Sequence, residues 1–79
     1  MRNHTETAGL RQNGPAIRAI RQREGLSVDK LAALVPMSAP HLRNIENELK
    51  NASIEHLAAL AKQLDVPMAA LRRDREDAE

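Results

Sequence analysis

Histidine, arginine and asparagine supply the side chains in this 79-residue sequence that could do chemistry. The three histidines, His4, His41 and His56, are scattered, and none has a partner at the spacing of a metal site or a catalytic triad. Glu55 and His56 are adjacent, so a helix would turn them to different faces. The sequence also contains no cysteine, no glycine-rich phosphate loop and no paired-carboxylate motif. We therefore expect no enzymatic activity, no metal, no cofactor and no small-molecule effector.

A denser group of polar side chains lies between residues 38 and 51. Among them, Arg43 can pair with the edge of guanine or with a phosphate, and Asn44 can pair with the N6/N7 edge of adenine. Residues 11–50 carry seven Lys/Arg and four Asp/Glu, a local charge of +3 in a chain of net charge +1. This balance permits phosphate binding without demanding it. The competing interpretation is that Arg43 and Asn44 are solvated residues on an exposed face.

Short helices with local start and stop signals must position these side chains. The tripeptide Asn13-Gly14-Pro15 predicts the start of a first helix, which Gly25 ends. Ser27 and Ser38 are the predicted N-caps of a second and a third helix, and Pro36 ends the second. The residues that carry the polar chemistry therefore belong to the third helix and to the loop after it.

The second half of the chain continues this pattern. Ser53 predicts the cap of a fourth helix, and Val66-Pro67 precedes a short fifth helix from Met68 to about Arg72. The predicted buried positions, at helical spacing, are Ile17, Ile20, Leu31, Leu34, Val35, Leu42, Ile45, Ile54, Leu57, Ala58, Ala61 and Leu64. No segment predicts a strand. The sequence therefore predicts an all-α bundle of five short helices.

The composition limits the size and the setting of this bundle. Apolar residues make up 42% of the sequence, but Phe, Tyr and Trp are absent, so the core must be aliphatic. We expect one domain at residues 13–73, a flexible N-terminal arm at 1–12 and an acidic tail at 74–79 with a summed charge of −3. The sequence has no cysteine, no membrane-length apolar run and no signal-peptide core. These features predict a cytoplasmic protein.

Only three or four residues join the second and third predicted helices. So short a connection suits two short helices that cross steeply, the helix-turn-helix arrangement. Ala32 would let the helices approach closely, and the Ser38 side chain would accept a bond from the N–H of His41. Pro40 is tolerated in the first turn, where N–H groups lack intrahelical partners. The outward side of the third helix would then carry Ala39, Pro40, His41, Arg43, Asn44 and Asn47.

Five short motifs occur together between about Ile17 and Leu71. They are Ile-Arg-x-Ile-Arg at 17–21, Gly25-Leu26-Ser27, Leu31-Ala32, Asn44-Ile45-Glu46 and Ser53-Ile54-x-x-Leu57. In combination they resemble the Cro/C1 (Xre-type) repressor family. This resemblance implies a five-helix, lambda-repressor-like domain that binds double-stranded DNA, usually as a homodimer. The lack of a membrane-length apolar run separately predicts no membrane partner.

The resemblance also implies roles for individual residues, with the third helix entering the major groove by its N-terminal half. Ala39, Pro40 and Asn44 fall where the family contacts bases, and His41 and Arg43 lie beside them. Ala39 and Pro40 offer only contacts to thymine methyl groups, so specificity would depend partly on DNA shape. The candidate phosphate contacts are Arg18, Ser38, Asn47 and Lys50, with Asn51 and Arg11 as weaker ones. In the competing interpretation, Pro40 rigidifies a helix start and Lys50 is an ordinary loop cation.

Three positions depart from the family pattern. Val28 replaces a glutamine that usually touches a phosphate, and Pro36 replaces the usual glycine of the turn. Glu48 replaces a glycine after the third helix and would place a carboxylate near the DNA backbone. Our first hypothesis is a sequence-specific transcriptional regulator, a repressor that occupies an operator as a dimer. The alternative is a protein-interaction module of the same fold, such as an antitoxin or an accessory factor.

Two further residue pairs lie outside the set of residues expected to contact DNA. Arg21 and Glu46 occupy positions that the family often joins by a salt bridge, and we expect a partly exposed pair worth about 0–1 kcal/mol. Met68 and Leu71 either close the core or form a dimer patch. The patch is favoured, because a domain of this size gains from extra burial.

Overall fold

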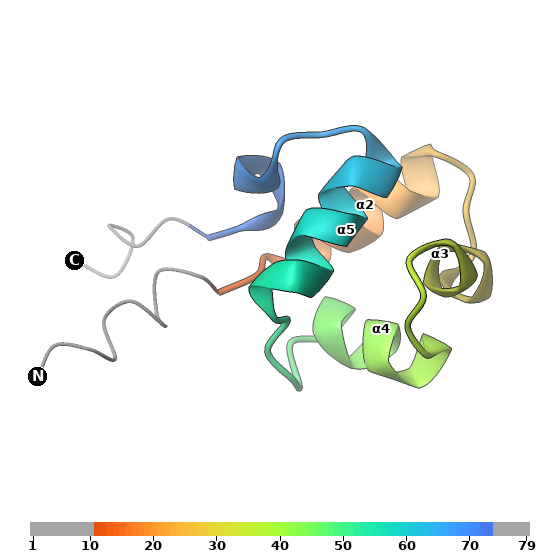
Figure 1. Cartoon of the computed structure of the whole chain (residues 1–79), viewed down its shortest axis with the longest axis horizontal. Helices are drawn as coiled ribbons and strands as arrows, with labels where there is room; N and C mark the ends of the chain where they lie inside the picture. The colour runs from red at the N-terminus through yellow and green to blue at the C-terminus, as the bar shows by residue number, and fades with distance from the viewer. Residues whose placement is uncertain (1–10, 74–79) are drawn as a thin grey trace, which may run out of the picture.

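A computed structural model describes residues 11–73 (Figure 1). Four α-helices and one 3-10 helix follow in order: α2 at Gly14–Arg23, α3 at Val28–Leu34, α4 at Ala39–Glu46, α5 at Ile54–Leu64 and η1 at Met68–Leu71. Within residues 11–73 no strand forms, and a single isolated antiparallel bridge joins Gln12 to Arg72. The all-α prediction is confirmed. Predictions for residues 1–10 and for the tail at 74–79 lie outside the described residues.

The predicted fifth α-helix is instead the 3-10 helix η1, so the five-helix count is corrected to four α-helices in the described part of the chain. Its four residues follow Pro67, whose carbonyl accepts from the amide of Ala70 at 2.9 Å. This is the i→i+3 bond of a 3-10 turn. A segment of one turn has no room for a run of i→i+4 bonds, which explains the difference.

Each of the four α-helices begins at a polar residue whose side chain accepts a hydrogen bond from the amide three residues on. These bonds satisfy N–H groups that a helix start leaves free. The caps are Asn13, Ser27, Ser38 and Ser53, with N···O distances of 3.0–3.1 Å. The three predicted serine caps are confirmed, including the bond from the amide of His41 to Ser38 Oγ.

Each of these helices also ends at a residue with positive φ, and only one of the four is glycine. They are Gly25 (φ 75°), Pro36 (φ 24°), Glu48 (φ 62°) and Asp65 (φ 60°). The amide of the following residue donates back to a carbonyl of the last helical turn in all four cases, at 2.8–3.1 Å. This is the Schellman motif. The chain therefore turns sharply at three places where the sequence offers no glycine.

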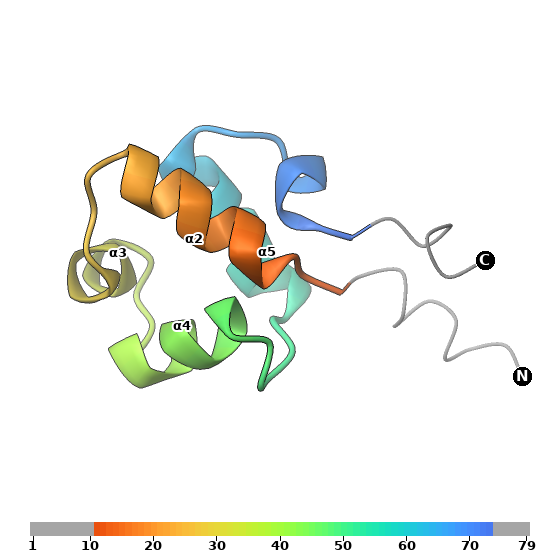
Figure 2. The ribbon, with the colours of Figure 1, turned by 180° about the vertical axis from the view of Figure 1, so that it is seen from behind.

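An aliphatic core holds the helices together, as the composition predicts. α5 lies in front of α2 in Figure 1 and behind it in Figure 2, and α3 and α4 lie to one side. Every helix contributes at least one side chain that is fully buried: Ile17, Leu31, Leu42, Ile45, Leu57, Leu60 and Leu71. Burial of one such side chain stabilises a fold by about 1.5–3 kcal/mol.

Three predicted core positions are wrong. Leu34 and Ile54 are each 48% exposed, and Ala58 is exposed. The buried stripe of α5 runs instead through Leu57, Leu60, Ala61 and Leu64. Ala58 lies about a quarter of a turn away from that stripe. In α3 the stripe is centred on Leu31, Ala32 and Val35, which leaves Leu34 on its flank.

Gln12 belongs to the packed domain rather than to the arm in which the sequence analysis placed it. It is 2% exposed, and its amide Nε2 donates to the carbonyls of Ile45 and Lys50 at 3.1 and 2.7 Å. Its Oε1 accepts from the amide of Ala52 at 3.2 Å. One side chain thus ties the start of the described chain to the loop between α4 and α5.

Candidate nucleic-acid interface

The turn between α3 and α4 has the predicted compact form. Figure 1 looks almost along α3, whereas α4 runs across the view, so the two helices cross steeply. Ala32 is 2% exposed, and the amide of Met37 donates to its carbonyl at 3.0 Å. Pro36 keeps the positive φ of a turn glycine, although its ring favours a φ near −65°. The turn therefore has a positive φ at this position without a glycine.

α4 has one buried face and one exposed face. Leu42, Ile45 and Glu46 point inward and are buried. The residues predicted to face outward are exposed or half-buried: Ser38, Pro40, Arg43 and Asn47 are exposed, and Ala39, His41 and Asn44 are half-buried. The helix lies along one edge of the molecule in both ribbon views (Figures 1 and 2). It can therefore enter a groove without any rearrangement of the core.

Arg43 is the exposed cation of this surface, and its side chain is 54% exposed. Its Nη2 lies 3.8 Å from Oδ1 of Asp29 on α3, a carboxylate that is itself 78% exposed. So long and exposed an ion pair contributes little to stability. It leaves the guanidinium free to exchange Asp29 for another acceptor. The proximity of Asp29 depends on how α3 packs on α4, so no local sequence pattern signals it.

Arg18 projects from α2 toward the end of α4. Its Nη2 donates to Oδ1 of Asn47 at 2.6 Å, and its Nε lies 3.6 Å from Oε1 of Glu46. A cavity of about 260 Å³ opens here, lined by Pro15, Arg18, Glu46, Asn47 and Glu48. The structure thus brings together two of the predicted phosphate contacts, Arg18 and Asn47, at the C-terminal end of α4.

The Arg21–Glu46 pair joins α2 to α4, as predicted, but it is buried rather than partly exposed. Arg21 donates through Nε and Nη2 to the two oxygens of Glu46 at 2.7 and 3.0 Å. Its Nη1 donates to the carbonyl of Leu26 at 2.9 Å. The hydrogen bond to Glu46 raises the pKa of Arg21 against the opposing effect of burial. This charged pair fixes how α4 sits on α2.

Glu48 does not face the outside as an unpaired carboxylate. Its Oε2 accepts from the amide of Gly14 at 2.7 Å and from Nη2 of Arg73. Burial alone would raise the pKa of this carboxyl, but the Gly14 amide and the Arg73 guanidinium lower it, and the net pKa lies below its ordinary value. The carboxylate therefore caps the N-terminus of α2. The expected repulsion of a phosphate by Glu48 is largely neutralised.

α2 and α4 approach so closely at Gly14 that no side chain fits there. A Cβ built on Gly14 would lie 2.1 Å from the carbonyl oxygen of Glu46. The buried ion pair, the Glu48 cap and this close approach all act on the same helix–helix junction. The contacts at its C-terminal end therefore fix how α4 lies against α2.

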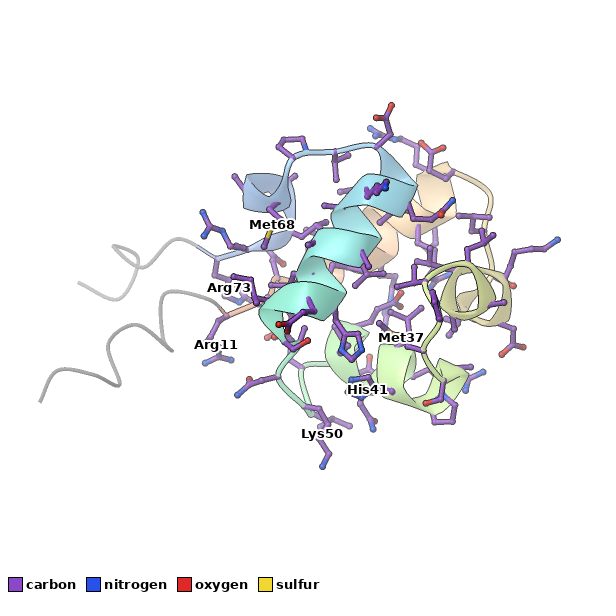
Figure 3. All side chains as sticks on the ribbon, viewed as in Figure 1. Arg11, Met37, His41, Lys50, Met68 and Arg73 are labelled. Atoms are coloured by element: carbon purple, nitrogen blue, oxygen red, sulfur yellow. The ribbon has the colours of Figure 1, made fainter. Side chains whose placement is uncertain are left out.

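His41 on α4 stacks edge-to-face with His56 on α5, with ring centroids 5.1 Å apart and an interplanar angle of 61°. Nδ1 of His56 is buried and has no hydrogen-bond partner within the described residues. The sequence places the two histidines 15 residues apart and gives no sign of this contact. His41 is therefore a half-buried residue with a packing role at the edge of the outward face (Figure 3).

The remaining predicted residues separate into two places. Lys50 extends from the loop after α4, on the same side of the molecule as α4, whereas Arg11 lies beside Arg73 where the described chain begins and ends (Figure 3). Leu71 is fully buried, and Met68 is half-buried against the core. The favoured interpretation of these two as a dimer patch is therefore wrong for Leu71, which closes the monomer core.

Side chains of α4 and its surroundings can act through hydrogen bonds, methyl contacts and charge. Within residues 11–73 no three histidine or carboxylate side chains come together as metal ligands. None of the helices in that range is long and apolar enough to cross a membrane. The geometry is that of a helix-turn-helix protein with an exposed second helix.

Comparison with known proteins identifies the family. A family profile described as Helix-turn-helix (HTH_3) matches residues 17–71, which is more than half of the chain. The chain therefore belongs to this helix-turn-helix family, of the Cro/C1 (Xre) type. A comparison with curated protein sequences gave no significant match.

Solved structures of regulators are similar to this fold. The restriction-modification controller protein C.AhdI from Aeromonas hydrophila has a TM-score of 0.70 and 28% identity, over 72% of this chain and 86% of that chain. The N-terminal DNA-binding domain of SinR from Bacillus subtilis has a TM-score of 0.67 and 32% identity, over 71% and 83%. SinR, described as the master regulator for biofilm formation, in complex with DNA has a TM-score of 0.68 and 32% identity, over 71% and 90%.

Proposed function

We propose that this protein is a sequence-specific, double-stranded DNA-binding transcriptional regulator, a repressor that occupies an operator as a homodimer. The observation that carries the proposal is the outward face of α4, which is exposed at Ser38, Pro40, Arg43 and Asn47 and is held in place by the buried Arg21–Glu46 pair. The protein would bind DNA by noncovalent contacts and would need no catalytic group. A protein that occupies an operator would act in the cytoplasm. The solved complex of the similar protein SinR with DNA supports this assignment.

Direct reading of bases would come from few side chains. Arg43 is exposed and weakly paired, and Asn44 is half-buried, so both can present donors at the groove floor. Ala39 and Pro40 would contact thymine methyl groups. His41 would pack beside them rather than read a base, because His56 covers one side of its ring. Part of the specificity would therefore come from DNA shape.

Phosphate contacts would flank this reading surface. Ser38 and the amide of Ala39 lie at one end of the helix, and Arg18, Asn47 and Lys50 lie near the other. Arg18 can leave Asn47 for a phosphate because its side chain is 47% exposed. Two groups of donors at opposite ends of α4 would align the helix along the groove.

The alternative, a protein-interaction module such as an antitoxin or accessory factor, rested on departures from the family pattern. Pro36 has the positive φ of a turn residue, and the Glu48 carboxylate already accepts hydrogen bonds from the Gly14 amide and the Arg73 guanidinium. Two of the three departures therefore no longer argue against DNA. A similar structure, the SinR protein/SinI protein complex, has a TM-score of 0.73 and 28% identity, over 84% of this chain and 65% of that chain. Its title names a protein partner, so the alternative needs an experimental test.

The test is selection of bound duplexes from a random pool, followed by binding measurements on the selected sequence. We expect Arg43→Ala and Asn44→Ala to weaken binding about 5- to 150-fold each, equivalent to about 1–3 kcal/mol per good base contact. Lys62→Ala, which removes an exposed cation from the far end of α5, is the matched control and should bind like the parent.

Two outcomes would contradict the proposal. If both α4 variants bind the selected duplex as the parent does while remaining folded, α4 is not the reading helix. If no duplex is enriched and a pull-down instead recovers one stoichiometric protein partner, the protein-interaction module is the correct assignment.

A further inference from the structure

Arg43 has two possible partners on DNA, the edge of a guanine and a phosphate. In the structure a carboxylate lies beside it, because Oδ1 of Asp29 is 3.8 Å from Nη2 of Arg43. Both side chains are exposed, at 78% for Asp29 and 54% for Arg43. They belong to different helices and meet because α3 crosses α4. Any DNA group that Arg43 contacts must therefore share the guanidinium with this carboxylate or displace it.

The core and a helix cap hold the backbone on both sides of this pair. Leu31 on α3 and Leu42 on α4 are fully buried, and the side chain of Ser27 caps the start of α3. Asp29 lies in the first turn of α3, where a negative charge is favourable. The α3 backbone therefore keeps the carboxylate close to α4 whether or not it pairs with Arg43.

Asp29 differs from the other carboxylates close to α4, which already have strong partners. Glu46 is buried and binds Arg21 through both of its oxygens. Glu48 accepts hydrogen bonds from the start of α2 and from the end of the described chain. Within residues 11–73 the one salt bridge of Asp29 is the long contact with Arg43, and so exposed a pair adds little to stability. The charge of Asp29 therefore matters most for what Arg43 can bind.

We propose that Asp29 is a positioning residue that directs Arg43 to a guanine rather than to a phosphate. The inference rests on the proposed function and names one base that the operator would contain. A guanidinium has five N–H donors. Two of them bind O6 and N7 of guanine, which leaves others for Asp29 at the same time. The carboxylate repels a phosphate, whereas the uncharged edge of a guanine is not repelled.

The Asp29 carboxylate acts against unrelated DNA more than against the operator. Binding to unrelated DNA comes almost entirely from phosphate contacts and the counterions that they release. Asp29 removes one such contact on every duplex but leaves the base contact intact. Loss of this charge should therefore strengthen binding to unrelated DNA and reduce discrimination. Loss of an ordinary DNA contact would instead weaken binding to every duplex.

The test compares Asp29→Asn with Asp65→Asn on three duplexes. These are a selected duplex, the same duplex with one G·C pair replaced, and a scrambled duplex. The replaced pair is the one at which Arg43→Ala relaxes selectivity. Asp65→Asn removes the same charge at the C-terminal end of α5, on the opposite side of the molecule from α4 (Figures 1 and 2), and asparagine tolerates the positive φ of this position.

Two quantities should change in Asp29→Asn. On the scrambled duplex, the slope of log K against log salt should become steeper by about 0.9, the value for one more phosphate contact. The ratio of affinities for the selected and the replaced duplex should fall about fivefold or more. Asp65→Asn should change neither the slope nor the ratio.

Two further variants separate positioning from a direct contact between Asp29 and DNA. Asp29→Glu keeps a carboxylate at this position and should retain most of the selectivity that Asp29→Asn loses. In an Arg43→Ala background, Asp29→Asn should leave selectivity unchanged, because no guanidinium remains to be directed. If it still changes selectivity there, Asp29 itself contacts a base, such as N4 of a cytosine, and the proposal is overturned.

Failure of this inference can be distinguished from failure of the proposed function. If Arg43→Ala weakens binding but Asp29→Asn keeps the slope and the affinity ratio of the parent, Asp29 does not direct Arg43 and the proposed function stands. If Arg43→Ala weakens binding to all duplexes alike, Arg43 contacts a phosphate and only the inference is wrong. If no duplex is enriched in the selection, the proposed function fails and the inference fails with it.

Discussion

Pro36 holds a backbone conformation that its ring opposes. Its φ of 24° lies far from the value near −65° that the pyrrolidine ring favours. Proline also lacks the amide that would donate the second Schellman bond, so this helix end forms only the bond from Met37 to Ala32. Strain of this kind costs on the order of 1–3 kcal/mol.

Pro36→Gly should therefore stabilise the protein. It removes the strain and restores a donor, and these gains exceed the roughly 0.4–1 kcal/mol lost because glycine makes the unfolded chain more flexible. We expect a gain of about 1–2 kcal/mol, which corresponds to a melting temperature higher by roughly 4–15 °C. Pro40→Ala, at a first-turn position that suits proline, is the control and should give no gain. A lower melting temperature for Pro36→Gly would contradict the account of strain.

Glu48 links stability to pH. Its pKa is lowered in the folded state, so its contribution is fully present above the unfolded pKa of about 4.3 and is lost as pH falls through the folded value. Glu48→Gln should lower the melting temperature at neutral pH, and the difference from the parent should shrink as pH falls below about 4. Thermal unfolding, monitored by circular dichroism at several pH values between neutral and below about 4, measures this difference in melting temperature. Glu24→Gln, which replaces an exposed carboxylate by a carboxamide, is the control variant.

At the scale of the elements, the junction of α2 and α4 is the part of the fold most sensitive to charge. Glu46 is 4% exposed, so Glu46→Ala would leave the Arg21 guanidinium buried and unpaired. We expect a loss of about 3–5 kcal/mol, measured by urea unfolding. The double variant Arg21→Met with Glu46→Leu should recover most of this loss. If Glu46→Ala costs less than about 1 kcal/mol, the pair behaves like the exposed one expected from the sequence.

Helix starts and helix ends differ in how well the sequence predicts them. A cap such as Ser53 makes its bond to an amide three residues away, so the local sequence is enough. The end of α5 is different, because Asp65 has a positive φ although it is not a glycine. Only the structure reveals this helix end, through the bond from the amide of Val66 to the carbonyl of Ala61. The burial of Gln12 was missed for a related reason: its partners lie 33–40 residues further along the chain.

At the scale of the whole molecule, affinity for DNA should depend on salt through several separate phosphate contacts. Each neutralised phosphate adds about 0.9 to the slope of log K against log salt. Lys50→Ala should reduce this slope by about one and weaken binding to all sequences alike. Arg43→Ala should instead relax selectivity at one base position. Titrations of a selected and a scrambled duplex at several salt concentrations distinguish the two. Equal effects of both variants on both duplexes would contradict the division of roles.

The outward face of α4 could be predicted because helical periodicity alone places Leu42 and Ile45 inward and Arg43 outward. The neighbours of that face could not be predicted from the sequence. Asp29 beside Arg43 and His56 beside His41 belong to other helices, and their positions follow from packing. The contacts of Ser38, Ala39, Pro40, Asn44 and Lys50 with DNA remain predictions, which the duplex selection would test.

The two ends of the described chain run side by side. The amide of Arg73 donates to the carbonyl of Arg11 at 3.0 Å, and the amide of Asn13 donates to the carbonyl of Leu71 at 2.8 Å. A short peptide bridge could therefore join residue 11 to residue 73 and close the domain into a ring without moving any helix. Backbone cyclisation would restrict the unfolded chain and so favour the native state. It would also permit a circularly permuted form opened at the exposed bend around Gly25.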